Sequence, residues 1–163
     1  MPTKGPDVAT AASRAAASDV VTVSRHDGGV ALLTFDNSAH FNSIDASIMG
    51  ELHRKVNALL ADPAVRAIVL TGKGKTFSTG ADVKQFAAGV KDGTTVQWVL
   101  DTTAELHPLL LELRASEKVF VAAVNGVAAG GGLGLALAAD ARIGGPDARF
   151  AAGYFGLGLS PDG

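Results

Sequence analysis

Short apolar runs alternate with segments of helical period along this chain, and this alternation constrains the fold more than any other feature. Residues 67–71 and 119–124 are apolar runs of strand length, and each follows a segment whose apolar residues recur at helical spacing. Strands that alternate with helices pack as layered domains with parallel strands, because a parallel strand pair needs a long crossover. The sequence therefore predicts an α/β fold.

Turn and cap residues locate the other elements. Residues 20–24 and 30–35 flank the turn sequence Asp27-Gly28-Gly29 and predict a β-hairpin. Asp45 is typical of a helix N-cap, and Asp62-Pro63 ends the helix that follows it. The remaining expectations are a helix over residues 95–113 that Pro108 kinks or splits, a small-residue helix over residues 133–139, and short strands at residues 141–143 and 149–151.

Composition excludes several classes of protein. The chain has 163 residues, of which 47% are hydrophobic and none is cysteine. This length suits one domain with its own core, and the lack of cysteine excludes a disulfide scaffold and any cysteine-based zinc site or nucleophile. The net charge of −2 gives no electrostatic footprint for nucleic acid, and the apolar runs are too short to span a membrane. We expect a cytoplasmic protein without nucleic-acid or membrane partners.

Residues 1–18 are expected to form a disordered tail in front of a folded unit over residues 19–163. The tail is small, polar and alanine-rich, without an apolar period. A secretory signal needs a continuous apolar stretch of about 7–15 residues, whereas Val8 stands alone among small residues. A transit peptide is the alternative, with Asp7 and Asp19 counting against it.

Two glycine-rich loops, residues 72–82 and 125–132, directly follow the two apolar strands. Ligands of parallel α/β sheets gather at the carboxyl ends of the strands, so these loops are the first places to look for a site. Neither loop carries a nucleotide-binding motif. Val69 and Gly132 stand where the two possible P-loops need glycine and lysine, and Leu135 and Leu137 stand where a dinucleotide fingerprint needs its third glycine.

Side-chain motifs offer no other chemistry. The chain contains neither a Gly-x-Ser-x-Gly elbow nor a His-x-x-x-His pair. No metal site is predicted, and the histidines are expected on the surface or in loops: His26, His40, His53 and His107. The two glycine loops lead into helix N-termini, whose backbone N–H groups either serve tight turns or converge on a developing negative charge. Spacing alone leaves both interpretations open.

Two segments of these loops carry longer motifs. Residues 77–83 read F-S-T-G-A-D-V, and residues 121–132 read V-A-A-V-N-G-V-A-A-G-G-G. They resemble the F-S-x-G-A-D-[ILV] and A-x-[VI]-[NH]-G-x-A-x-G-G-G segments of the enoyl-CoA hydratase/isomerase (crotonase) family. Residues 35–37, 42–44 and 69–72 fit the same order and spacing, so the resemblance covers roughly residues 20–163.

The resemblance implies a crotonase-like spiral of ββα units that binds acyl-CoA thioesters, with no cofactor beyond the coenzyme A of the substrate. By motif position, the backbone N–H groups of Ala81 and Gly131 are the catalytic donors that hold the thioester oxygen. Such donors need a close backbone approach, which glycine permits. The residues expected to bind substrate are Ala39, His40, Phe41, Asn42, Gly80, Asp82, Val83, Lys84, Gly130 and Tyr154, with Lys84 a candidate phosphate contact.

The catalytic carboxylates of hydratases are replaced in this sequence. The resemblance places Gly134 and Tyr154 where hydratases of the family carry glutamates, and water addition needs one group to activate water and another to protonate carbon. Asp162 resembles the single acidic residue of some family isomerases, and its alternative role is that of a turn aspartate. Asp140 is expected to be structural. The sequence therefore favours an enoyl-CoA isomerase with Asp162 as its catalytic carboxylate.

The resemblance also predicts what surrounds this chain. Family members usually continue into helices that close the acyl pocket and build a trimer or hexamer. We therefore expect residues 19–163 to be a crotonase-like core that lacks the C-terminal helical region, and a homotrimer or hexamer for the full-length protein. The alternative to an isomerase is a non-catalytic family member that binds acyl-CoA or only assembles. The position of the Asp162 carboxylate relative to Ala81 and Gly131 discriminates between the two.

Overall fold

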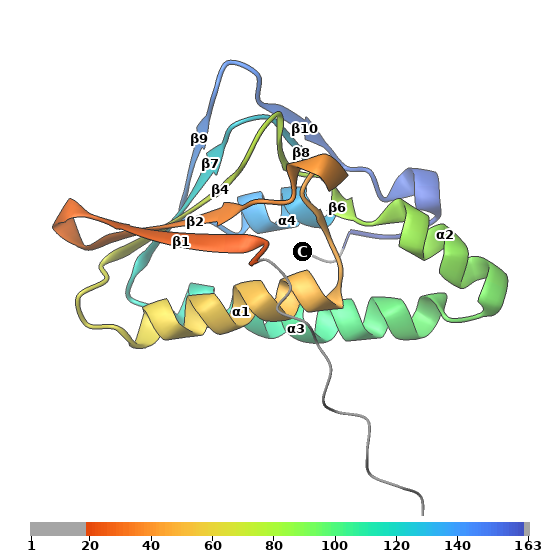
Figure 1. Cartoon of the computed structure of the whole chain (residues 1–163), viewed down its shortest axis with the longest axis horizontal. Coiled ribbons are helices and arrows are strands. Elements are labelled where there is room, and N and C mark those ends of the chain that lie inside the picture. The colour runs from red at the N-terminus through yellow and green to blue at the C-terminus, as the bar shows by residue number, and fades with distance from the viewer. Residues whose placement is uncertain (1–18, 162–163) are drawn as a thin grey trace, which may run out of the picture.

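The structure is a computed structural model that describes residues 19–161. The predicted disordered tail, residues 1–18, and the residues Asp162 and Gly163 lie outside the described part. The elements in chain order are β1 (Val21–His26), β2 (Val30–Phe35), β3 (Ser43–Ile44), α1 (Ala46–Ala61), β4 (Ala67–Gly72), β5 (Thr76–Ser78), β6 (Gly80–Ala81), α2 (Val83–Asp92), α3 (Thr95–Ala115), β7 (Val119–Val124), β8 (Val127–Ala129), α4 (Gly131–Leu137), β9 (Ala141–Gly144) and β10 (Arg149–Ala151) (Figure 1). None of the helices in this part of the chain is long and apolar enough to cross a membrane.

The strands form one main sheet and two small ones, which confirms the α/β prediction. The main sheet has five strands in the order β1-β2-β4-β7-β9, and within it only the β1–β2 hairpin is antiparallel. The two small sheets are the parallel sets β10-β8-β5 and β3-β6; β10 is the strand predicted over residues 149–151, whereas β5, β6 and β8 lie in the glycine-rich segments predicted as loops. The strands β5, β6 and β8 have only two or three residues each, which is too short for a pattern of alternating apolar residues to predict them.

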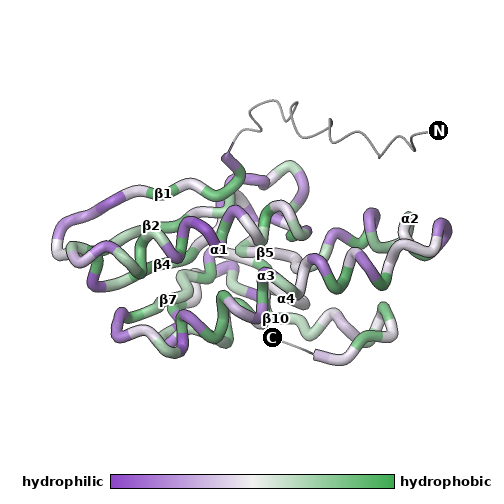
Figure 2. Tube along the Cα trace, turned by 90° about the horizontal axis from the view of Figure 1, so that it is seen from below, coloured by the Kyte–Doolittle hydropathy of each residue, from purple (hydrophilic) through white to green (hydrophobic). Residues whose placement is uncertain are grey.

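The observed helices match the predicted ones where the sequence carries an N-cap residue or a wide apolar face. The Asp45 carboxylate accepts the N–H of Ile48 at 2.9 Å and starts α1, which ends at Ala61 as predicted. Of the kink or split predicted at Pro108, the split is wrong: α3 is one helix, and its apolar face packs on the core through Leu106, Leu109 and Leu113. The sequence missed α2, which lies apart at one end of the molecule and buries only Gly89 (Figure 2).

The helices α1 and α3 lie side by side beneath the main sheet (Figure 1). Their buried side chains recur at helical spacing on the face turned toward the strands. They join alternate residues of the sheet in one apolar core, which holds the C-terminal ends of β4 and β7 in place. The largest fully buried side chains of this core are Phe35, Phe77, Leu33, Met49, Leu52, Ile68, Leu70, Leu109 and Leu135.

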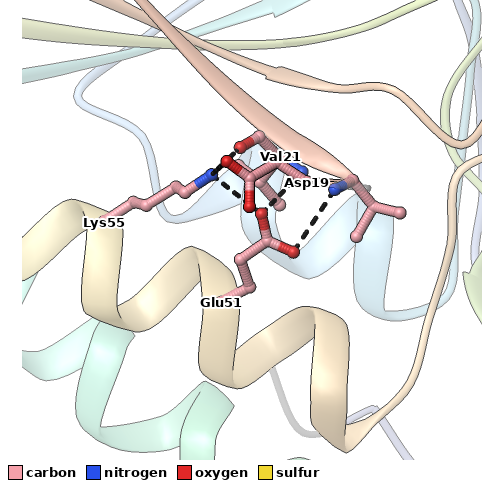
Figure 3. Close-up of polar contacts among 5 residues, drawn as sticks. Asp19, Val21, Glu51 and Lys55 are labelled. Carbon is pink, nitrogen blue, oxygen red and sulfur yellow. Dashed lines mark hydrogen bonds and ion pairs between the residues drawn. The ribbon is translucent and has the colours of Figure 1, made fainter. Parts of the chain in front are cut away.

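Two side chains of α1 tie the start of β1 to this helix layer (Figure 3). The Glu51 carboxylate accepts the N–H groups of Val20 at 3.3 Å and Val21 at 3.1 Å. Lys55 donates to the Val21 carbonyl and pairs with Glu51 at 2.8 Å and Asp19 at 3.1 Å. Burial of the ammonium opposes its charge, but the hydrogen bonds and charges of Glu51 and Asp19 outweigh this and raise the pKa of Lys55.

His53 joins α1 to α3, which corrects the expectation that it is a surface or loop residue. Its side chain is 16% exposed and lies between Glu105 and Glu112, with Nδ1 and Nε2 each 2.8 Å from a carboxylate oxygen. Burial opposes protonation, but the hydrogen bonds and charges of the two glutamates outweigh it, so the pKa of His53 is raised. The imidazole therefore bridges the two helices, and the bridge is strongest when the ring is protonated.

We expect this bridge to make folding stability fall with rising pH. A raised folded-state pKa means that its stabilisation is complete below the unfolded-state pKa of about 6.5 and is lost as the pH rises through the folded-state value. His53→Gln should therefore lower the thermal unfolding midpoint more at about pH 6 than at about pH 9. Glu112→Gln should shrink the same difference, because the imidazolium then keeps one anionic partner. An equal effect of His53→Gln at both pH values would contradict the bridge.

Candidate active site

An apolar cavity of about 70 Å³, here called the inner cavity, lies between β6, α3 and α4. It brings together Ala81 and Gly131, the two residues predicted to donate backbone hydrogen bonds, with Tyr154 as a third predicted residue. None of the described residues that line it carries a charged side chain. The lining is Ile44, Ala81, Trp98, Val99, Thr102, Thr103, Leu106, Gly131, Tyr154 and Leu159.

Close contact between the backbones of β6 and α4 brings the two predicted donors to one place. A Cβ on Gly80 would lie 2.6 Å from the Ala129 carbonyl oxygen and 2.7 Å from the Gly131 nitrogen, and Gly80 also has a φ of +76°. Only glycine fits both conditions. The neighbouring residue Gly132 approaches β5 equally closely, because a Cβ there would lie 2.4 Å from the Ser78 carbonyl oxygen. Gly80 and Gly130 thus shape the backbone and are absent from the cavity lining.

The hydrogen bonds around Ala81 and Gly131 indicate where their N–H groups point. Asp82 donates its N–H to the Ile44 carbonyl of β3 at 3.2 Å. Successive N–H groups of a strand point to opposite sides, so the Ala81 N–H faces away from β3. Gly131 is the first residue of α4 and has no carbonyl one turn earlier in the helix to receive its N–H.

A second pocket, here called the outer pocket, has a volume of about 270 Å³ and shares Ala81 with the inner cavity. Most of the predicted substrate contacts lie here, including the 65% exposed Phe41 side chain. The Asp82 carboxylate is also the N-cap of α2, where it accepts the N–H groups of Lys84 and Gln85. The predicted residues that line the outer pocket are Ala39, His40, Phe41, Asp82, Val83 and Lys84.

Asn42 is not a substrate contact, which corrects the sequence prediction. Its side chain is fully buried, donates to the carbonyls of Thr76 at 2.8 Å and Lys73 at 3.1 Å, and accepts the N–H of Asn37 at 3.0 Å. Its backbone carbonyl accepts the hydroxyl of Ser78 at 2.8 Å. Asn42 therefore holds the loop after β4 in place behind the outer pocket.

The two other predicted carboxylate positions differ in what the structure shows. Asp162 lies outside the described residues, but Leu159, three positions earlier, lines the inner cavity. The expectation that Asp140 is structural is confirmed, because its carboxylate accepts the N–H of Phe120 at 2.8 Å. Gly134 is buried in α4 and supplies no side chain.

The sequence prediction missed the contribution of α3 to the inner cavity. Trp98, Thr102 and Leu106 recur every four residues, so they lie on one face of the helix, and Val99 and Thr103 lie beside them. This spacing is visible in the sequence, but a helical period does not say which face meets a cavity and which meets the core.

Residues 25–163 match the family model described as enoyl-CoA hydratase/isomerase. The chain belongs to the enoyl-CoA hydratase/isomerase family. It is 37% identical over 144 residues to a probable enoyl-CoA hydratase of Mycobacterium tuberculosis, covering 88% of this chain and 53% of the relative. It is 33% identical over 137 residues to the 4-chlorobenzoyl coenzyme A dehalogenase-2 of Arthrobacter sp, covering 84% of this chain and 49% of the relative.

Solved structures of enoyl-CoA hydratases confirm the crotonase-like fold. The crystal structure of the enoyl-CoA hydratase from Bacillus halodurans superimposes with a TM-score of 0.80 at 28% sequence identity, covering 88% of this chain and 57% of that chain. The chain thus spans about half the length of the curated family members it matches. The family accordingly includes both relatives named hydratases and one named a dehalogenase.

Proposed function

We propose that this family member binds acyl-CoA thioesters and isomerises enoyl-CoA, moving a carbon–carbon double bond through an enolate. The observation that carries the proposal is the inner cavity, whose lining includes both Ala81 and Gly131. In this proposal their N–H groups donate to the thioester oxygen as it gains negative charge. Fixed backbone donors in apolar surroundings stabilise such an oxygen strongly, because they need no reorganisation as the charge develops.

The outer pocket is proposed to hold the coenzyme A part of the substrate. It adjoins the inner cavity at Ala81, so a thioester placed there has room on both sides. The 39–41 segment and Val83 offer backbone and apolar surface, and the Lys84 ammonium offers a charge for a phosphate. No further cofactor is proposed, since coenzyme A is part of the substrate.

Asp162 is proposed to move the proton. Its carboxylate would take a proton from C2 of a 3-enoyl-CoA, leaving a dienolate, and return the proton to C4 to give the 2-enoyl-CoA. The position of Leu159 in the lining of the inner cavity supports this role, since it brings the chain to the cavity shortly before Asp162. One carboxylate is enough for this transfer, whereas hydration needs a second acid–base group.

A homotrimer or hexamer is proposed for the full-length protein. Large apolar side chains on one stretch of the chain, from α4 to β10, are exposed to solvent, and such surface is typical of an interface. They are Leu137 at 55%, Ile143 at 65% and Phe150 at 55% exposure.

An assay with two substrates tests the isomerase proposal against its alternatives. We expect a 3-enoyl-CoA to be converted to the conjugated 2-enoyl-CoA, followed by its absorbance. Hydration of a 2-enoyl-CoA is expected to be far below the range of about 1–10³ per second typical of enzymes. This expectation follows from Gly134 and Tyr154, which supply no carboxylate. Rapid hydration would favour the activity for which the relatives are named, and binding without turnover would favour a non-catalytic member.

Gly131→Pro should remove one donor while the helix persists. Proline is well tolerated at the first helical position, where its missing N–H has no partner in the helix. A Cβ at this position meets only the Ile44 Cδ1 atom, at 3.1 Å, which is the end of a flexible side chain. We expect the isomerisation rate constant kcat to fall by about 10²–10³-fold.

The control for this variant is Gly131→Ala, which adds the same Cβ and keeps the N–H. Its loss of kcat measures the effect of the added carbon atom alone. If the proline variant is no slower than the alanine variant, Gly131 does not donate to the thioester oxygen.

A further inference from the structure

The helix α3 consists of two parts that meet at Pro108. Every α3 residue that lines the inner cavity comes before the proline, in residues 95–107, here called the cavity half, whereas Leu109 and Leu113 follow it and are buried in the core. Pro108 has no N–H to donate to the Ala104 carbonyl one turn earlier, and its ring crowds that carbonyl. The helix is nevertheless continuous, so support from outside the helix is expected at this point.

His53 of α1 supplies such support on both sides of the proline. Its Nδ1 lies 2.8 Å from a Glu105 carboxylate oxygen, and its Nε2 lies 2.8 Å from a Glu112 carboxylate oxygen. Glu105 precedes Pro108 by three residues, and Glu112 follows it by four. Since α1 and α3 lie side by side, one imidazole ring spans the gap in the hydrogen-bond ladder of α3 (Figure 1).

The protonation state of His53 decides whether both sides of the proline are held. An imidazolium donates from both nitrogens, whereas a neutral ring donates from one nitrogen and presents a lone pair at the other. Burial opposes protonation, but the hydrogen bonds and charges of Glu105 and Glu112, which face the ring from α3, outweigh it and raise the pKa of His53. The ring therefore spans Pro108 below this pKa and releases one side as the pH rises through it.

We propose that His53 is a positioning residue that acts through Glu105 and Glu112: it holds the cavity half of α3 in line across Pro108, and so keeps the inner cavity in shape for the acyl group. This inference rests on the proposed function, because it takes the inner cavity as the acyl site. Within the described part of the chain, His53 is not among the residues that line the inner cavity or the outer pocket, so its effect on binding passes through α3. The ring takes no part in the proton transfer.

The fluorescence of Trp98 reports the position of the cavity half. Trp98 is the only tryptophan of the chain and lies in this half, where its ring packs against Phe86 of α2 with centroids 6.2 Å apart. In the unmodified protein we expect its emission to change in one step as the pH rises, with a midpoint above about pH 6.5. The step should be absent in His53→Gln. It should also be absent in Pro108→Ala, because alanine restores the N–H that the Ala104 carbonyl lacks.

Calorimetric titration with butyryl-CoA connects this step to the site. From about pH 6 to about pH 9, the affinity of the unmodified protein should fall by about two- to tenfold, the range expected when two partly exposed ion pairs stabilise the binding-competent form. The fall should be smaller in His53→Gln and in Pro108→Ala. The matched control is His26→Gln, the same change at an exposed histidine of β1, which should retain both the fluorescence step and the fall in affinity.

If butyryl-CoA binds at no pH, the proposed function is wrong and this inference falls with it. If butyryl-CoA binds but its affinity has the same pH dependence in His53→Gln as in the unmodified protein, the proposed function stands and the role of His53 is overturned. A missing fluorescence step in the unmodified protein, or a step that persists in Pro108→Ala, overturns that role as well. These last two measurements do not require His53→Gln to fold.

Discussion

Asp162→Asn is expected to lower isomerase activity by about 10²–10⁴-fold, the usual contribution of a positioned general base. Asparagine has nearly the same shape as aspartate, so the Pro161-Asp162-Gly163 sequence keeps its turn-forming character. It cannot take up a proton at working pH, so the transfer from C2 to C4 loses its carrier. Affinity for a saturated acyl-CoA should change by less than about tenfold, because the proposed N–H donors and the outer pocket are untouched.

The sequence offers a matched control for this variant. Asp147 also follows a proline, is exposed, and lies in the turn between β9 and β10. Asp147→Asn makes the same chemical change away from both pockets, so it should leave the activity as it was. Full activity in Asp162→Asn would reduce Asp162 to a turn residue and would assign the proton transfer elsewhere.

Asn42→Ala is expected to destabilise the folded protein by about 2–6 kcal/mol. The substitution removes the Asn42 partner of the Lys73 carbonyl and of the Asn37 N–H, whereas the Thr76 carbonyl keeps the Asn125 side-chain amide at 3.3 Å. Each buried group left without a partner costs about 1–3 kcal/mol. Asn42 also has a φ of +51°, which asparagine tolerates better than alanine. Against a typical total of about 5–15 kcal/mol, the loss should be plain in urea unfolding curves.

Asn57→Ala serves as its control, since Asn57 is exposed on α1. Its effect on the free energy of unfolding should stay within about 0.5 kcal/mol. A loss below about 1 kcal/mol for Asn42→Ala would mean that the loop after β4 holds together without this side chain.

Local signals in the sequence were enough for the elements that carry their own caps and apolar period. The β1–β2 hairpin follows from its turn residues, and α1 follows from Asp45 and a strong apolar face. The helix α2 has an equally good N-cap in Asp82. It was not predicted, because Asp82 and the residues before it belong to the glycine-rich segment that was predicted as a loop. The strand β5 pairs with β8, and β6 pairs with β3. Such pairing between distant segments cannot be predicted from either segment alone.

The candidate site, like the fold, was predicted only in part. The motifs placed Ala81 and Gly131 in two loops, and the structure places both in one cavity lining. The same motifs misassigned Asn42, because a polar residue in a loop has the same appearance in a sequence whether it faces a ligand or the backbone behind it. The contribution of α3 to the lining of the inner cavity was not predicted, because the face that a helix turns toward a cavity depends on how the helix packs in the whole fold.

The contact of Gly80 with the start of α4 divides the site into a part that resists mutation and a part that accepts it. Any side chain at Gly80 collides with main-chain atoms, which cannot move without displacing β6 or α4. On the cavity face of α3, Leu106 belongs to the core, whereas Trp98 and Val99 are half-buried and can change size with less disturbance of the main chain. Under the proposed function, the contacts of the acyl group can therefore change along a single helix face, while the two main-chain donors to the thioester oxygen stay the same.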